Sequence, residues 1–411
     1  MKRIGIIFAI AAIVATLLVS CGKKMKPPTE VPYQGIIGDT LYLMVNPPWD
    51  FAHGFNFEQV TSVYFGHDTY LYVADSGNGS GDGRILQMDV AGTIHGEFRP
   101  DGYFSPISIS QDELMRLLVV TGEKKVYRID LGPSGDPLVK TVFDYNVNPI
   151  RRDSLVIPSD RFMSITDLPD YDRSYYVAVS SSSVSNGRIL WFWGSRDNSD
   201  YGDSLFSHKF AYRNRAYYED SLHVPWAFDP QFGTTIGVAD GDTFMNPVVT
   251  TGNGIVNTVE PNFIYAYESS SALHLLVCQD EGSFPVHDMR YEVETHLYNV
   301  YWTFGVSQYP GESEMLRSGL FDVPRSAAMD PYGNVYVVDS GSNRSCGAFK
   351  FSKTGALLKT FCDPDSIDTF HNPRSITYDI YGDRRTVFIA DTDGNGRTRI
   401  LRYKLSTDLE H

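Results

Sequence analysis

Short apolar segments separated by turn residues recur along the chain after residue 35. The clearest copy spans 324–344, where one apolar strand is followed by a turn at Gly333 and by a second strand that ends at Asp339. Similar copies begin at Val60 and at Pro373. Apolar runs of this length, bounded by Gly, Asp and Asn, are typical of β-strands, and no long helical period follows residue 21. The pattern predicts an all-β domain.

Four weaker copies lie between these three, which gives seven candidate units. They share paired apolar strands and span 105–143, 161–212, 225–259 and 261–305. Each unit holds about four strands, which is the sequence form of a propeller blade, and radial stacking buries the faces that one blade leaves exposed. We expect a β-propeller of six or seven four-stranded blades. Even spacing slightly favours seven, and the alternative for 225–259 is an insertion.

The segment before the first unit is expected to close the ring. Residues Ile36–Val45 include the strand-like run Leu41-Tyr-Leu-Met-Val. A strand added from here to the last blade would remove the exposed sheet edges.

The repeats resemble NHL repeats, in which a strand ending Val-Ala-Asp-Ser-Gly-Asn precedes Arg-Ile and a second strand. The match is close at Val73–Asn78 with Arg84-Ile85 and good at 337–344. It is also good at 389–391 with Arg399-Ile400, and loose across 105–305. The resemblance implies a propeller of six blades, sometimes more, that recognises protein, glycan or nucleic acid.

The N-terminus has the form of an export signal. Lys2 and Arg3 precede an apolar stretch, Ile4–Val19, that is short for a membrane span. It ends in Leu18-Val-Ser-Cys21-Gly, which resembles the bacterial lipobox, and an uncleaved anchor helix is the alternative. The resemblance implies cleavage before Cys21 and acylation of its new N-terminus, which anchors the chain stably in a membrane.

The lipobox sets the expected domain organisation and location. Residues 1–20 are the signal peptide, 21–35 are the acylated cysteine with a Pro-rich tether, and 36–405 form the propeller. Gly22 stands where the familiar inner-membrane retention signal has Asp. We therefore expect a lipid-anchored protein of the cell envelope, held in the outer membrane if the cell is Gram-negative.

Three further cysteines agree with export. Cys346 and Cys362 flank a predicted hairpin that turns at 353–355, so they fall nearly opposite each other. A disulfide between them is geometrically reasonable and is stable outside the cytoplasm, and two free thiols are the alternative. Cys278 lies in an apolar run, as a buried strand residue does.

The charge limits the class of partner. The chain carries 35 Lys and Arg against 50 Asp and Glu, a formal net charge of −15. Nucleic acids and anionic membrane surfaces attract basic faces, so neither is expected as the main partner of the domain.

One loop has the composition of a calcium site. Asp391, Asp393 and Asn395 place oxygen ligands at alternate positions, with Gly396 available for a sharp turn. Calcium is the one cofactor that the sequence suggests, and an ordinary turn is the alternative. The twelfth position is Arg402 rather than Glu, so the loop is not an EF-hand.

Two functional classes remain. The first is a binding or scaffold module for an envelope protein or glycan, and strand aromatics at 191–193 and 301–302 would serve either a sugar-binding face or packing between blades. The second is a metal-dependent hydrolase or lyase, because some propellers related to NHL domains, the gluconolactonase-like and peptidyl-hydroxyglycine lyase-like enzymes, hold a metal at the channel mouth with carboxylate, Asn or His ligands. For such a site the strand ends offer Asp75, Asp240, Asp339 and Asp391. We find no serine-nucleophile elbow, zinc motif or phosphate loop, which favours the binding module.

Overall fold

The computed structural model describes the parts of the chain that build the β-domain. Backbone contacts divide the chain into Met1–Gly38 and Asp39–His411, and every described residue belongs to the second unit. The described residues are 42–131, 137–145, 160–168, 174–181, 188–193, 208–212, 228–229, 234–235, 260–269, 272–280, 285–292, 297–300, 319–341, 347–353, 355–361, 370–379 and 385–405.

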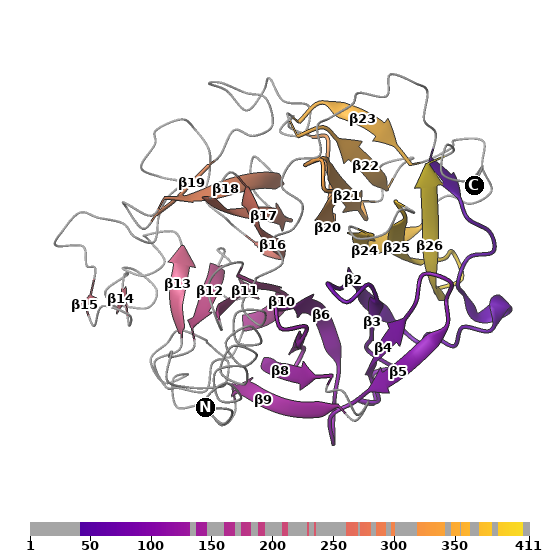
Figure 1. The fold of residues 1–411 in the computed structure, drawn as a ribbon, viewed down its shortest axis with the longest axis horizontal. Coiled ribbons are helices and arrows are strands. Elements are labelled where there is room, and N and C mark those ends of the chain that lie inside the picture. Colours follow the sequence, from indigo (N-terminus) through magenta and orange to yellow (C-terminus); the bar gives the residue numbers. More distant parts are fainter. Residues whose placement is uncertain are drawn as a thin grey trace, which may run out of the picture. The chain divides into compact units, whose positions relative to one another are not determined.

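These residues form six four-stranded antiparallel sheets, each ordered from an inner to an outer strand (Figure 1). Blade 1 holds β2 (Val60–Phe65), β3 (Leu71–Asp75), β4 (Arg84–Met88) and β5 (Ile94–Phe98). Blade 2 holds β6 (Pro106–Gln111), β7 (Leu117–Thr121), β8 (Lys125–Asp130) and β9 (Leu138–Asp144). Blade 3 holds β10 (Asp160–Asp167), β11 (Ser174–Ser181), β12 (Arg188–Trp193) and β13 (His208–Tyr212).

The second half of the chain repeats the arrangement. Blade 4 holds β16 (Pro261–Ser269), β17 (Ala272–Gln279), β18 (Val286–Glu292) and β19 (Leu297–Val300). Blade 5 holds β20 (Pro324–Met329), β21 (Val335–Asp339), β22 (Ala348–Phe351) and β23 (Leu357–Thr360). Blade 6 holds β24 (Asn372–Tyr378), β25 (Val387–Thr392), β26 (Thr398–Leu405) and β1 (Tyr42–Met44). A short 3-10 helix, η1 (Phe51–His53), links β1 to β2.

The inner strands pack against one another in a closed ring. Each of β2, β6, β10, β16, β20 and β24 contacts the next, and β24 contacts β2. An inner strand has one edge with no strand partner, and the preceding blade supplies hydroxyl groups to it. Val63 N–H donates to Ser375 Oγ at 3.0 Å and Phe65 N–H to Thr377 Oγ1 at 3.0 Å. The predicted all-β propeller is therefore confirmed.

The slight preference for seven blades is wrong. Blades 3 and 4 are direct neighbours, because Ile264 N–H donates to Ser164 Oγ at 3.2 Å and Ala266 N–H to Thr166 Oγ1 at 2.9 Å. The described residues of the candidate unit 225–259 form a two-stranded ribbon, β14 (Phe228–Asp229) with β15 (Thr234–Thr235). No blade separates β10 from β16 in the described part of the chain.

The predicted closing strand is confirmed. Tyr42 pairs with Leu405, Leu43 with Lys404 and Met44 with Tyr403, so β1 covers the outer edge of β26. The phenolic oxygens of Tyr42 and Tyr336 lie 2.8 Å apart, which also ties this strand to blade 5. The chain thus closes its own ring with residues from both ends of the β-domain.

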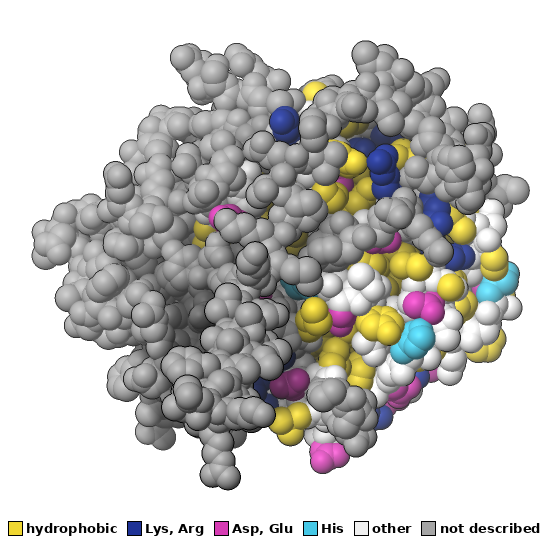
Figure 2. Space-filling model, viewed as in Figure 1, with side chains coloured by type: hydrophobic (Ala, Val, Ile, Leu, Met, Phe, Trp, Pro, Cys, Tyr) yellow, Lys and Arg dark blue, Asp and Glu magenta, His cyan; other side chains and the backbone are white. Residues whose placement is uncertain are grey.

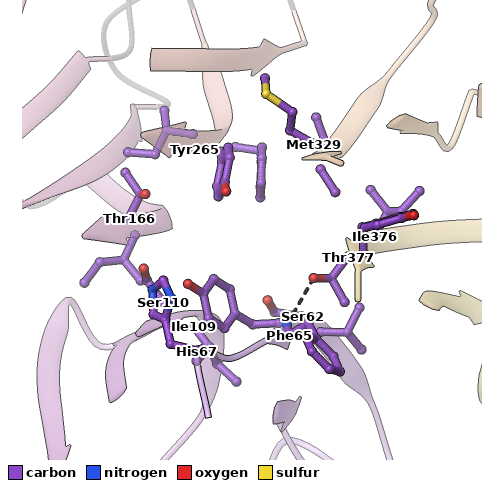
Figure 3. Close-up of a pocket in the computed structure, with 18 residues that line it drawn as sticks. Ser62, Phe65, His67, Ile109, Ser110, Thr166, Tyr265, Met329, Ile376 and Thr377 are labelled. Carbon is purple, nitrogen blue, oxygen red and sulfur yellow. Dashed lines mark hydrogen bonds between the residues drawn. The ribbon is translucent and has the colours of Figure 1, made fainter. Parts of the chain in front are cut away.

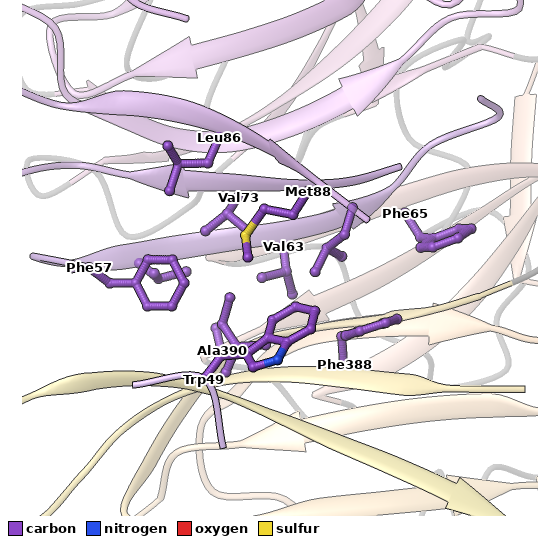
Figure 4. Close-up of a cluster of buried hydrophobic side chains, with 12 residues drawn as sticks. Trp49, Phe57, Val63, Phe65, Val73, Leu86, Met88, Phe388 and Ala390 are labelled. Atoms are coloured by element: carbon purple, nitrogen blue, oxygen red, sulfur yellow. The ribbon is translucent and has the colours of Figure 1, made fainter. Parts of the chain in front are cut away.

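Apolar side chains fill the spaces between blades, as Figure 4 shows for blades 6 and 1. Trp49 is 2% exposed and lies among Phe388, Val63 and Met88. The central strand of each clear repeat is buried on both faces, so its sequence is continuously apolar rather than alternating. The turns follow the sequence as well: Gly333 adopts φ 80°, a left-handed conformation that favours glycine.

Several predictions lie outside the described residues. They are the signal peptide, Cys21 and its tether, Asp240, and the disulfide partners Cys346 and Cys362. Among the described residues no helix has the length and apolar character needed to span a membrane.

Candidate ligand-binding channel

A pocket lies in the central channel and is lined by all six inner strands. Its cavity volume is about 60 Å³. Figure 3 shows side chains around this space, with Tyr265 on one side and His67 opposite. Lining residues come from the middle and the far end of each inner strand, such as 62–65 of β2 and 376–378 of β24. The pocket therefore lies toward the turns that join each inner strand to the second strand of its blade.

The small hydroxyl side chains of the channel wall hold the ring together. Ser110 Oγ accepts Asp167 N–H of the next blade at 2.9 Å, and Thr166 and Thr377 accept the equivalent N–H groups of the blades that follow them. These hydrogen bonds between blades occupy part of the acceptor capacity of the hydroxyl oxygens. These hydroxyls make the wall polar without charging it.

Larger side chains give the pocket its specific character. Tyr64 of β2 and Tyr265 of β16 are both partly exposed. In β2 and in β16 one residue, Thr61 or Asn262, is skipped in the pairing with the second strand, and each tyrosine lies three residues after the skipped one. The two tyrosines therefore occupy equivalent positions on strands that are three blades apart in the ring of six. The two tyrosines therefore enter the pocket from opposite walls. Burial raises the pKa of Tyr265, so its hydroxyl stays protonated.

His67 marks one end of the pocket, in the turn after β2. Its side chain is exposed to the channel, yet the protein around it partly desolvates the ring and lowers its pKa from 6.5. The turn is held by Gln111, whose Oε1 accepts His67 N–H at 2.6 Å and whose Nε2 donates to Asp68 at 3.0 Å. Tyr72 also donates to Asp68. His67 is thus a neutral donor and acceptor on a fixed turn.

Part of the described surface on one face is apolar. Figure 2 shows hydrophobic side chains exposed among uncharged ones near the middle of the described surface. Acidic and histidine side chains lie beside them.

The strand-end aspartates do not line this pocket. Asp75, Asp339 and Asp391 pair with Val60, Pro324 and Pro373, which lie at or next to the start of their inner strands. The pocket is formed by later residues of the same strands. The three described carboxylates thus lie away from this pocket, and the described residues place them in no cluster that could hold a metal.

Each of these carboxylates is engaged within its own blade. Asp75 accepts Gln59 N–H at 2.7 Å and Arg84 Nε at 3.3 Å. Asp339 accepts Val323 N–H at 2.7 Å. All three are nearly inaccessible, with exposed fractions between 0% and 3%. They bind the loop that leads into the inner strand, which is a structural role.

The predicted calcium loop has the same internal bonding. Asp391 accepts Asn372 N–H at 2.8 Å and lies 2.8 Å from Arg399 Nη2, while burial raises its pKa. Asp393 accepts the N–H groups of Asn395 and Arg397 at 2.8 Å each, as in an ordinary Asx turn. Asn395 is exposed. This arrangement gives the calcium prediction no support, and the residues described contain no cluster of three His, Cys, Asp or Glu placed to hold a metal.

The remaining candidate residues have different outcomes. Cys278 is a free and fully buried strand residue, as predicted. The aromatic side chains at 191–193 and 301–302 lie outside the described part of the structure. The sequence did not predict the pocket residues Tyr64, Tyr265 and His67. A tyrosine within a strand is expected to pack in the core, and only the fold shows which strands line the channel.

Comparisons with solved structures return proteins of low sequence identity. A protein proposed to be a gluconolactonase is 10% identical over 90% of this chain and 93% of its own, with a TM-score of 0.49. A virginiamycin B lyase from Staphylococcus aureus is 10% identical over 87% and 88%, with a TM-score of 0.40. PorZ of Porphyromonas gingivalis is 13% identical over 82% of this chain and 38% of its own, with a TM-score of 0.44.

No family model matches the chain, and no curated protein matches its sequence. Likenesses at this level assign no activity. The propeller fold rests on the strand pairing and on the ring of inner strands described above.

Proposed function

We propose that this chain is a lipid-anchored envelope protein whose propeller binds a neutral, partly apolar group in its central channel. A sugar residue of an envelope glycan fits this chemistry best. The observation that carries the proposal is the pair of partly exposed tyrosines, Tyr64 and Tyr265, on opposite walls of one pocket.

The lining suits a sugar because sugar rings present apolar C–H faces and hydroxyl edges. Tyrosine offers an apolar ring for the face and a hydroxyl for the edge. His67, with a lowered pKa, adds a neutral donor and acceptor at the end of the pocket. A mostly apolar pocket with a few directed polar groups is the usual form of a small-molecule site.

Binding of envelope glycan fragments by the full-length protein in detergent tests this proposal. Isothermal titration calorimetry should show a Tyr265→Ala variant binding about tenfold or more weakly, as for a buried aromatic anchor. The matched control is Tyr103→Ala, since Tyr103 is 51% exposed and does not line the pocket. Equal affinities for the Tyr265 variant and the native chain would refute the assignment.

The alternative, a metal-dependent hydrolase or lyase, finds no favourable observation. Its predicted ligands Asp75 and Asp339 already accept backbone N–H groups. These bonds stabilise the entry to each inner strand, so the repeat explains the aspartates without a metal.

The anchor and the repeat family belong to the same proposal. The lipobox sequence around Cys21 supports acylation and residence in the cell envelope, in the outer membrane of a Gram-negative cell. The segment Val73–Asn78 supports kinship with NHL repeats. A Cys21→Ser variant should move to the soluble extracytoplasmic fraction, and its retention in the membrane fraction would contradict the anchor.

A further inference from the structure

The inner strands share an irregularity at the end of the channel opposite the pocket. Near the start of each strand one residue is skipped in the pairing with the second strand. Such a bulge re-aims the side chain of the extra residue. The skipped residues, in ring order, are Thr61, Ile107, Met163, Asn262, Arg325 and Arg374.

Two arginines therefore occupy equivalent positions on neighbouring strands. β20 packs directly against β24, and Ile376 N–H donates to Ser326 Oγ at 3.2 Å one residue beyond the bulge of β20. Arg325 and Arg374 are the residues immediately before Ser326 and Ser375 on these strands. Their side chains begin from adjacent points at this end of the ring.

Arg325 is already engaged. Its Nε donates to Ser340 Oγ at 3.0 Å, and its Nη1 lies 3.2 Å from Asp280 Oδ2. Asp280 also accepts the Asn262 side-chain amide, which donates to Pro324 O at 2.7 Å as well. One carboxylate thus serves two of the four polar bulge residues, Asn262 and Arg325.

Arg374 has no such partner among the residues that the structure describes. Its Nε is buried without a hydrogen bond, and the described structure gives its guanidinium no ion pair. An arginine stays charged in proteins, and partial desolvation of a charge without a counterion is unfavourable. Burial, and after it the charge of Arg325, lowers the pKa of Arg374. The positive charge of Arg325 thus makes the charged form of Arg374 still less favourable.

We propose that Arg374, together with Arg325, binds an oxyanionic group, a carboxylate or a phosphate, at this end of the channel. The guanidinium fork matches both groups in a bidentate geometry. The chain is acidic, with a net charge of −15, yet no described carboxylate pairs with the half-buried guanidinium of Arg374. A bound anion would supply the missing counterion. The site lies at the opposite end of the channel from Tyr265 and does not depend on the proposed function.

Anion-dependent thermal stability of the full-length protein in detergent tests this site. Inorganic phosphate and acetate are titrated separately at an ionic strength kept constant with sodium chloride. We expect the melting temperature of the native chain to rise with one of them, and the anion that acts identifies the group. In Arg374→Gln the affinity should fall about ten- to hundredfold, as for a lost hydrogen bond between charged groups.

The same variant carries a second, independent expectation. Without added anion, Arg374→Gln should melt at a higher temperature than the native chain, because it removes a partly desolvated charge that has no counterion. Arg374→Lys keeps the charge without the fork and should bind weakly. The control is Arg397→Gln, an exposed arginine in the turn between β25 and β26 that is not one of the bulge residues. Equal anion responses in the native and Arg374→Gln proteins, or no response to either anion, would overturn the proposal.

Discussion

The strand-end aspartate of blade 5 offers the most direct test of the structural role assigned to these carboxylates. Asp339 accepts the N–H groups of Asp322 at 2.8 Å, Val323 at 2.7 Å and Gly341 at 3.0 Å. Its side chain is 3% exposed. Replacement by alanine leaves three backbone donors around a site that water can only partly enter.

The expected loss follows from these three bonds. A buried donor that loses its acceptor costs roughly 1–3 kcal/mol, and neighbouring losses are less than additive. We therefore expect Asp339→Ala to lower the free energy of unfolding by about 3–5 kcal/mol. Asp339→Asn keeps one acceptor oxygen but turns an amide toward the donors, so it should lose about 2 kcal/mol.

Urea denaturation followed by tryptophan fluorescence measures the change. The control is Asp101→Asn, an exposed aspartate that should change stability by no more than about 0.5 kcal/mol. A metal-ligand role makes the opposite prediction, because removing one of several clustered carboxylates relieves repulsion in the metal-free protein. Unchanged or increased stability of Asp339→Ala would refute the structural assignment.

Two further predictions concern the core and the channel. Trp49→Ala should lower the free energy of unfolding by about 3–5 kcal/mol, since Trp49 is 2% exposed between blades 6 and 1. The control in the same urea denaturation series is Leu114→Ala, at a site that is 70% exposed. Its free energy of unfolding should lie within about 0.5 kcal/mol of the native value. His67 should titrate below pH 6.5 by NMR, because desolvation disfavours its charged form. The unfolded chain then takes up the proton first, so His67 costs stability as the pH falls through 6.5. A midpoint above 6.5 would contradict the partly desolvated position of the ring.

The number of blades could not be predicted from the sequence pattern alone. Repeats such as 324–344 predict their own strands because the signal is local: apolar runs, turn glycines and a closing Asp. Whether 225–259 stands between two blades depends on the contact of β10 with β16. That contact is made by Ser164 and Thr166, whose hydroxyls accept N–H groups one hundred residues away. A serine in a strand gives no indication of such a distant donor.

The aspartates show the same division within one repeat. The sequence determined that Asp75, Asp339 and Asp391 occupy equivalent strand ends, since register within a hairpin depends on neighbouring residues. It did not determine their partners. These are backbone groups some 16 to 20 residues earlier, brought close by the turn into each inner strand.

The sequence by itself determined the all-β class, the short strands with their turns, and the strand from the N-terminal side that closes the last blade. These follow from local apolar patterns and from the need to cover a sheet edge. Only the tertiary structure decided which wall residues share the channel, and that two arginines begin side by side at its other end. The physical reason is that six strands far apart in the chain meet at the axis. Tyr64 and Tyr265 come to line one pocket, and Arg325 and Arg374 come to lie on neighbouring strands, through ring closure alone.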